Sequence, residues 1–451
     1  MSRPNIVMVS FDSVRADHLP VYGYDRDTTP YLSSIADEGL VFEHSYVPGV
    51  GTPTSFGGTF TGDYINAVQS CTDIPHWQQA LQDRTLLSEV LSKHGYYCGG
   101  IHANGRLHRD YGWNRGWEAY GDYQWAEASA EGNNEWWGDI KKDVLLPAIQ
   151  KFGLGGQAIT TRNIIFKHSA YTPWESLWSD ITEFVETAPE PWFLWVLLVD
   201  THHPWYSPKK YHEWDQPGFR KSHLWNWLMR YHYEWAGERH PEIVNAYDNE
   251  LRHADAFLES LDDLLASTGN SEVPFILHSD HGDDLGEHGR YGHAPTMYDT
   301  VIRVPLIMRN VGETGRVTRP ITHLDLPNTI LRLAGSDERL GSDHTLIDNP
   351  REEEFVIIEN MTDDGDLMAA ATDGEWKVLY HPESGWEAYH RPSDRFEQND
   401  RLGDHPQDLK RAVVQHRQNR LPNHPGDSVN EEDKSDLRNV RENLANLGYI
   451  D

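Results

Sequence analysis

Residues 275–289 read Phe-Ile-Leu-His-Ser-Asp-His-Gly-Asp-Asp-Leu-Gly-Glu-His-Gly. The run opens with Phe275–Leu277, which has the continuous apolar pattern of a strand buried on both faces. Asp280 and His281 follow at once and offer a carboxylate oxygen and an imidazole, while Gly282 allows close approach of the backbone. The alternative, a capped turn in an acidic protein, needs these side chains to cluster by accident. We therefore predict a metal site where this strand ends.

Three further short apolar runs have the pattern of strands: Asn5–Phe11, Trp192–Val199 and Val304–Met308. Helix-like stretches lie between the runs, at Thr85–His94 and at Ile243–Ala266, which keeps an apolar face at helical spacing. Buried strands that alternate with helices predict an α/β fold, with a large mostly parallel sheet covered by helices on both faces. Active sites in such sheets lie at the carboxyl ends of the strands.

The domain organisation follows from changes in composition along the chain. We expect a catalytic domain over residues 1–342 and a small C-terminal subdomain over residues 343–451, where Met368–Leu379 alternates like strands around a turn. Two Trp-rich stretches, at about 106–178 and 205–235, are predicted to be insertions over the active face. Their aromatic side chains suit either a substrate pocket or ordinary packing.

The charge balance is strongly acidic. The chain carries 39 Lys and Arg against 71 Asp and Glu, a formal net charge of -32 at pH 7. This balance excludes nucleic acid as a partner, because binding to phosphate backbones requires a basic surface. The acidic residues are spread along the whole chain, which indicates a halophilic surface. In molar salt the Debye length falls to about 3 Å, so self-repulsion is screened and an anionic substrate can approach.

The N-terminal residues indicate a cytoplasmic location. Met1–Pro4 passes directly into the apolar run Ile6–Val9, so we expect no secretory leader. The longest apolar run, Trp192–Val199, is far shorter than the roughly 20 residues of a membrane span. Cys71 and Cys98 allow at most one disulfide, which fits a reducing, high-salt cytoplasm.

Three other motifs carry functional side chains, each with a structural alternative. Asp12 follows the first strand, where a carboxylate is either a metal ligand or a loop anchor. Thr52, before Pro53, is either a helix cap or a functional hydroxyl. His202 follows the strongest apolar strand and precedes His203 and Pro204, in a loop suited to contacting a ligand or donating a proton.

Together these residues resemble the sulfatase family, and the order of the motifs matches over nearly the full length of the chain. The resemblance implies an alkaline-phosphatase-like α/β sandwich with a small C-terminal antiparallel sheet and helix, of a haloarchaeal type. The motifs that carry it are Asn5–Val7, Asp12–His18, Tyr22–Tyr24, Thr28–Leu32, Glu38–Phe42, His202 with Pro204, Asp280–Gly282, Leu285–Gly289, Arg303–Ile307, Trp376–Val378, Tyr389, Asp394 and Glu397–Asn399.

The chain departs from the family at the nucleophile. Sulfatases carry a Cys/Ser-x-Pro-x-Arg motif whose first residue is oxidised to formylglycine. Counting back from Thr61-Gly62 places Thr52 at that position, with Thr54 in place of Pro and Phe56 in place of Arg. Oxidation of threonine stops at a ketone because its Cβ carries a methyl group. We therefore expect no formylglycine.

The resemblance implies one divalent metal ion, Mn, Zn, Fe, Ca or Mg. Its ligands would be Asp12, Thr52, Asp280 and His281. Thr52 would also be the nucleophile, because the superfamily's phosphodiesterases and phosphotransferases use threonine directly at this place.

The same resemblance places four further side chains near the reacting group. His202 would meet the leaving group or a non-bridging oxygen, and His288 or His293 would supply positive charge. Asn104 would donate to an oxygen of the transferred group. A turn residue before Gly105 is the equal alternative for Asn104.

These observations predict a metal-dependent hydrolase that cleaves phosphate diesters or phosphonate esters, with a small-molecule or glycan anionic ester as substrate. Three alternatives stay open: a sulfuric ester hydrolase without formylglycine, a head-group phosphotransferase, and a non-catalytic binding protein with the same fold. Turnover assays with phosphate and sulfate esters separate these possibilities.

Overall fold

The structure is a computed structural model of the 451-residue chain. It describes residues 3–65, 67, 74–123, 172–218, 221–222, 240–293, 295–362 and 364–420. Most of the two predicted insertions, about 106–178 and 205–235, lies outside these residues, as do Cys71 and the tail after residue 420. Residues Met1–Val413 form one compact unit.

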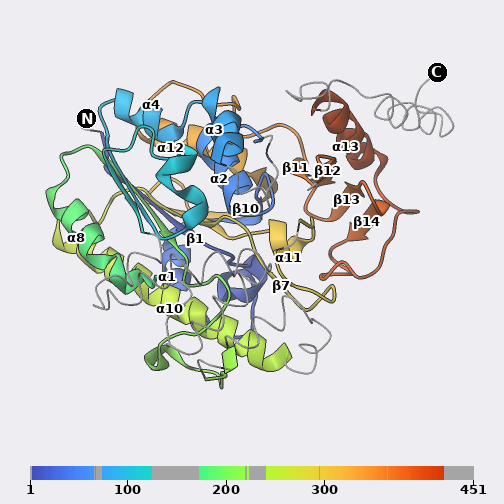
Figure 1. The fold of residues 1–451 in the computed structure, drawn as a ribbon, viewed down its shortest axis with the longest axis horizontal. Coiled ribbons are helices and arrows are strands. Elements are labelled where there is room, and N and C mark those ends of the chain that lie inside the picture. Colours follow the sequence, from blue (N-terminus) through green and yellow to red (C-terminus); the bar gives the residue numbers. More distant parts are fainter. Residues whose placement is uncertain are drawn as a thin grey trace, which may run out of the picture. The chain divides into compact units, whose positions relative to one another are not determined.

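Within the described residues, the large sheet has eight strands in the order β10-β2-β9-β6-β1-β5-β3-β4. Figure 1 shows the sheet at the centre of the unit, between two groups of helices. The strands are β1 (Ile6–Phe11), β2 (Leu40–Tyr46), β3 (Tyr97–His102), β4 (Ala119–Asp122), β5 (Trp192–Leu198), β6 (Phe275–Ser279), β9 (Leu306–Arg309) and β10 (Gly315–Thr322).

Strand β1 lies at the middle of this sheet and runs parallel to both neighbours. Val9 of β1 pairs with Val196 of β5 on one side and with Leu277 of β6 on the other. Strand β9 alone among these eight runs antiparallel to its neighbours, β2 and β6. The predicted fold class, a mostly parallel sheet with helices, is confirmed.

The helices cover both faces of the sheet because the buried strands are apolar on both sides. In β1, Val7 and Val9 pack into one core cluster, whereas Ile6 and Met8 pack into the other. Burying such a side chain contributes about 1.5–3 kcal/mol. The first cluster includes α1 (Pro30–Glu38), α8 (Trp178–Thr187) and α10 (His240–Ser267), and the second includes α2 (Thr52–Thr61), α3 (Ile74–Gln82), α4 (Leu87–Lys93) and α12 (Leu326–Leu333).

A smaller antiparallel sheet follows, as predicted, with the strand order β11-β12-β13-β14 in the described part of the chain. The predicted boundary near residue 342 falls between α12 and β11. The remaining elements are β7 (Asp284–Leu285), β8 (Tyr291–Gly292), α11 (Asp299–Ile302), β11 (Val356–Met361), β12 (Leu367–Thr372), β13 (Trp376–His381), β14 (Gly385–His390) and α13 (Gln407–Arg420). Over the described residues, no helix combines the length and apolar character that crossing a membrane requires.

Helix α2 is held tightly in the core. All ten of its residues are buried. A Cβ on Gly57 would lie 2.0 Å from Cγ1 of Ile65, and one on Gly58 would lie 2.3 Å from Cγ of Pro48. Only glycine permits this approach, and Gly51, with φ of 83°, turns the chain into the helix. The first residue of α2, Thr52, is therefore fixed in position.

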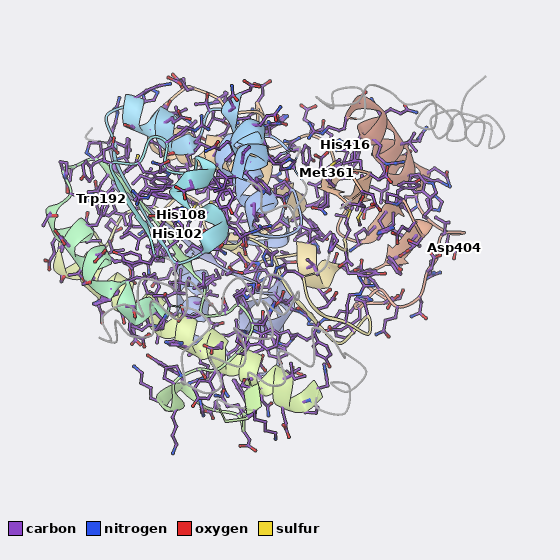
Figure 2. The ribbon with its side chains drawn as sticks, viewed as in Figure 1. His102, His108, Trp192, Met361, Asp404 and His416 are labelled. Carbon is purple, nitrogen blue, oxygen red and sulfur yellow. The ribbon has the colours of Figure 1, made fainter. Side chains whose placement is uncertain are left out.

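Polar residues follow the carboxyl ends of adjacent parallel strands. Asp12 follows β1, Asp280 and His281 follow β6, and His202 follows β5. The next strand in the sheet, β3, ends at the buried His102 and pairs with β5, which begins at Trp192 (Figure 2). Because these ends meet at one edge of the sheet, their side chains gather there.

Candidate metal centre and active site

Two buried carboxylates, Asp12 and Asp280, form the base of the site. Both residues are fully buried. Burial and the neighbouring Asp12 raise the pKa of Asp280 well above its ordinary value. Among the residues the structure describes, Oδ2 of Asp280 has no hydrogen-bond partner, and no Lys or Arg forms an ion pair with either carboxylate. Such a pair needs a cation to stay ionised.

His281 completes a donor set suited to a divalent cation. Its Nδ1 donates to the carbonyl of Gly282 at 3.0 Å, so Nε2 carries the lone pair. Nε2 lies 3.8 Å from Oδ1 of Asp12 and 3.6 Å from Oδ2 of Asp280. These values are near the roughly 3.4 Å between ligands around a tetrahedral ion with bonds of about 2.1 Å. Burial and the nearby His293 lower the pKa of His281 to about 4, so the ring is neutral, as a ligand must be.

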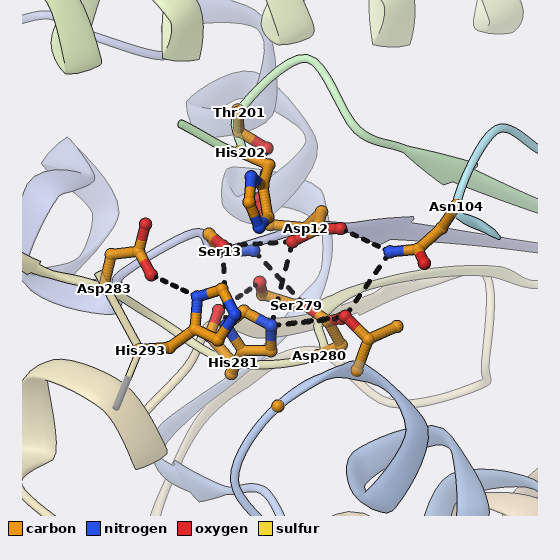
Figure 3. Close-up of polar contacts among 12 residues, drawn as sticks. Asp12, Ser13, Asn104, Thr201, His202, Ser279, Asp280, His281, Asp283 and His293 are labelled. Carbon is orange, nitrogen blue, oxygen red and sulfur yellow. Dashed lines mark hydrogen bonds and ion pairs between the residues drawn. The ribbon is translucent and has the colours of Figure 1, made fainter. Parts of the chain in front are cut away.

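The hydroxyl of Thr52 lies beside this donor set. Its Oγ1 is 3.3 Å from Nε2 of His281. Thr52 is also the first residue of α2, and the N-terminal end of a helix favours negative charge. The position suits both of the roles predicted for Thr52, metal ligand and nucleophile. Figure 3 shows Asp12, Asp280, His281 and Asn104 converging on one point.

Asn104 serves as a helix cap and also points into the site. Its Oδ1 accepts from the backbone N–H of Arg106 at 2.9 Å, which caps a short 3-10 helix. Its Nδ2 donates to Oδ2 of Asp12 at 2.8 Å and lies 3.4 Å from Oγ1 of Thr52. Asn104 is therefore the turn residue of one interpretation, and the cap directs its amide into the site; its donation to the transferred group stays a prediction.

Ser13, which the sequence did not single out, orients both carboxylates. Its backbone N–H donates to Oδ1 of Asp280 at 3.2 Å, and its Oγ donates to Oδ1 of Asp12 at 3.0 Å. Ser13 adopts a left-handed conformation with φ of 67°, which costs a non-glycine residue about 1–2 kcal/mol. Residues held in such a conformation cluster at functional sites.

A group of histidines lies beside the candidate metal ligands. The buried carboxylate of Asp283 accepts from Nδ1 of His293 at 2.8 Å and from Nδ1 of His203 at 3.2 Å. Burial alone would raise the pKa of Asp283, but His293 and His203 outweigh burial and lower it below its ordinary value. The His293 ring lies 4.2 Å from that of His281, and the His202 and His203 rings stack at 4.2 Å. Neither His203 nor Asp283 was predicted.

His202 is oriented by its own loop. Its Nδ1 donates to the carbonyl of His203 at 2.7 Å, which leaves Nε2 as the nitrogen with the lone pair. Burial and His203 lower the pKa of His202 to about 3, so the ring is neutral near pH 7. The adjacent Thr201 ties the loop to β1, because its Oγ1 donates to the carbonyl of Asp12 at 2.6 Å.

His288 lies in a different environment from the other predicted residues. Its ring stacks on Tyr298 at 3.7 Å, and the Tyr298 hydroxyl contacts Glu387 of the smaller sheet. The structure thus gathers Asp12, Thr52, Asn104, His202, Asp280, His281 and His293, and it places His288 beside Tyr298.

Comparison with known proteins gives consistent matches. A family model described as Sulfatase matches residues 4–336. The uncharacterized sulfatase YidJ of Escherichia coli (strain K12) is 24% identical over 362 residues, which cover 74% of this chain and 68% of YidJ. Phosphatidylethanolamine transferase Mcr-2 of Escherichia coli is 25% identical over 291 residues, 64% of this chain but only 44% of the transferase.

Solved structures share the fold. The phosphonate monoester hydrolase of Agrobacterium radiobacter superposes with a TM-score of 0.64 at 16% sequence identity. The superposition covers 93% of this chain and 95% of the hydrolase. At this identity, the likeness establishes a common architecture that includes the smaller sheet.

Proposed function

The chain belongs to the sulfatase family and is an ester hydrolase of the alkaline phosphatase superfamily; on that premise, we propose that it cleaves phosphate diesters or phosphonate esters with Thr52 as its nucleophile. Members of the sulfatase family bind a divalent metal. We assign the ligands here as Asp12, Thr52, Asp280 and His281.

One observation carries the proposal. The hydroxyl of Thr52, at the first residue of a buried helix, lies 3.3 Å from the neutral imidazole of His281, the ring that we assign as a metal ligand. A cation bound here would add positive charge beside the Thr52 oxygen and the transferred group. The hydroxyl is thus placed where its ionised form is most stable, and it needs no oxidation to act as a nucleophile.

The reaction has two steps. Ionised Oγ1 of Thr52 attacks phosphorus, the bond from phosphorus to the ester oxygen breaks, and the alcohol leaves with a proton. Water then cleaves the phospho-threonine and returns the proton to Thr52. Asn104 would donate to an oxygen of the transferred group, His202 would meet the leaving group or a non-bridging oxygen, and His293 would supply positive charge.

A second candidate, transfer of a head group to an alcohol, is favoured by the similarity to Mcr-2. Both reactions share the first step and differ only in whether water or another hydroxyl receives the phosphoryl group. Adding an alcohol acceptor separates them, because a transferase then forms a new ester with that alcohol, whereas a hydrolase releases a phosphate monoester or a phosphonate.

The test is a substrate panel. The protein would be purified in molar KCl, which screens its net charge of -32, and assayed with a phosphate monoester, a phosphate diester, a phosphonate monoester and a sulfate ester, each with several divalent metals. We expect metal-dependent cleavage of the diester or phosphonate. Thr52→Ala should lower the rate by about 10³-fold or more, and Thr52→Ser should retain a measurable rate.

Thr54→Val is the matched control, because Oγ1 of Thr54 donates back to the carbonyl of Val50 and not to the site. Acid-quenched enzyme should carry phosphate on Thr52 by mass spectrometry. Activity that survives Thr52→Ala would remove Thr52 as nucleophile, and cleavage of the sulfate ester alone would replace the phosphoester assignment.

A further inference from the structure

A second cluster of ligand-type side chains lies apart from the centre described above and shares no residue with it. Glu175 is on a short 3-10 helix before α8, Asp200 follows β5, and Glu250 and His253 are on α10. One ligand atom from each of Glu175, Asp200 and His253 lies within 4.8 Å of the others. Three carboxylates thus surround one imidazole.

The cluster carries excess negative charge. The side chains of Asp200, Glu250 and His253 are 2%, 5% and 3% exposed, respectively. With His253 protonated and all three carboxylates ionised, the cluster would carry a net charge of about -2. Among the described residues, the only lysine or arginine paired with the cluster is Lys210, with Nζ 4.0 Å from Glu175. Buried charge of this size needs compensation.

One carboxylate oxygen of Asp200 has no hydrogen-bond donor among the described residues. Oδ1 accepts from the backbone N–H of Trp174 at 3.1 Å and lies 3.6 Å from Nδ1 of His253. Oδ2 is buried and has no hydrogen-bond partner among the residues described. A buried carboxylate oxygen needs a donor or a cation as its partner, and the described residues supply no donor to this one.

Carboxylates lie close to both ring nitrogens of His253. Nε2 is 3.1 Å from Glu175, whereas Nδ1 is 3.2 Å from Glu250 and 3.6 Å from Asp200. A charge-assisted hydrogen bond is shorter, about 2.7–2.9 Å, as in the 2.8 Å pair between His18 and Asp248. Ligands around a tetrahedral ion with bonds of about 2.1 Å are roughly 3.4 Å apart.

We propose that this cluster is a second divalent cation site, with Glu175, Asp200 and His253 as ligands and Glu250 accepting the hydrogen of the ring nitrogen that does not bind. A mixed set of imidazole and carboxylates suits Zn²⁺ or Mn²⁺. The Glu175 side chain, 37% exposed, gives the ion access from solvent. The arrangement of a carboxylate behind a ligating histidine is common at metal sites.

A cation at this cluster would compete with protons for the same side chains, and it would have to displace the proton of the His253 nitrogen that it binds. Burial, together with Glu250, raises the pKa of Asp200 to about 7, although His253 opposes the rise. Burial lowers the pKa of His253, but Glu175 and Glu250 outweigh it and raise the pKa to about 10. Without a cation, the cluster therefore takes up protons.

The proposed ion would hold the loop that carries His202 in place. Asp200 directly precedes Thr201 and His202, so a ligand bond to Asp200 ties the start of this loop to α10. The inference does not depend on the role of Thr52, because it concerns metal content and not turnover.

The test is a count of bound metal. The full chain, dialysed against Zn²⁺ or Mn²⁺ and then freed of unbound ion, should contain two ions by elemental analysis. His253→Gln should contain one, and Asp280→Asn should also contain one, since it loses the other site. The same count in His253→Gln as in wild type would overturn the proposal, as would an Asp280→Asn protein that holds none.

Glu175→Gln is a second variant that should fold normally, because Glu175 is partly exposed. It should weaken binding at this site by about 10- to 100-fold, measured by titration calorimetry. Glu186→Gln, an exposed carboxylate on α8, is the matched control and should bind like wild type. Equal affinities in the two variants would show that the cluster is only an ion-pair network around a charged histidine.

Discussion

Asn104→Asp isolates the amide donor of Asn104 from its role as a helix cap. A carboxylate keeps the acceptor for the backbone N–H of Arg106 but removes the donor to Asp12. A hydrogen bond to a charged group is worth about 1.5–3 kcal/mol, which is roughly a 10- to 150-fold effect on rate at about 1.4 kcal/mol per tenfold. A further donor bond to the transferred group would bring the loss to about 10²–10³-fold.

The assay is steady-state kinetics on the best ester of the panel, with thermal melting measured in parallel. We expect kcat/KM of Asn104→Asp to fall by at least tenfold while its melting temperature stays close to that of wild type. Asn104→Ala should lose both activity and the cap. An Asn104→Asp enzyme within threefold of wild type would show that Asn104 acts only as a turn residue and would refute the reasoning.

Three other predictions concern metal and stability. Chelation with EDTA should abolish turnover and a divalent metal should restore it; turnover that persists in metal-free protein would contradict the assignment. Lys377→Met removes a buried amine 2.8 Å from Asp299 and 2.5 Å from Glu397. It should lower the free energy of unfolding, measured in urea, by about 3–5 kcal/mol. Arg332→Ala, which breaks a half-exposed ion pair, should lower it by less than about 1 kcal/mol. In metal-free protein, the pKa of His253 is raised to about 10, so the stability that protonated His253 contributes is complete below pH 6.5 and is lost as the pH rises toward 10. The urea midpoint of unfolding should therefore fall between pH 6.5 and 9.5. This fall should disappear when metal is bound or in His253→Gln.

The central strands could be predicted from the sequence because they are apolar on both faces and end abruptly in polar residues. The outer strand β10 (Gly315–Thr322) carries no such signal, since its first five residues are exposed or partly exposed and only its last three are buried. The antiparallel direction of β9 could not be predicted from the sequence either, because a short apolar run is the same in a parallel and in an antiparallel strand.

The predicted metal ligands lie together because each follows a strand or begins a helix at the same edge of the sheet. The parts that were missed depend on contacts that leave no local pattern. Ser13 adopts a left-handed φ, and Asp283 accepts hydrogen bonds from both His203 and His293, which are far apart in the sequence. The role assigned to His288 came from its motif, which does not reveal that its ring stacks on Tyr298.

The close packing of α2 has a consequence for laboratory evolution of this enzyme. A larger side chain at Gly57 or Gly58 would clash with Ile65 or Pro48, so substitutions at these two positions would unfold the protein before they changed its substrate range. Libraries that seek new specificities should instead vary the loop after β5, where His203 pairs with the buried Asp283 beside the candidate site. Thr52 would then stay fixed while its surroundings diversify.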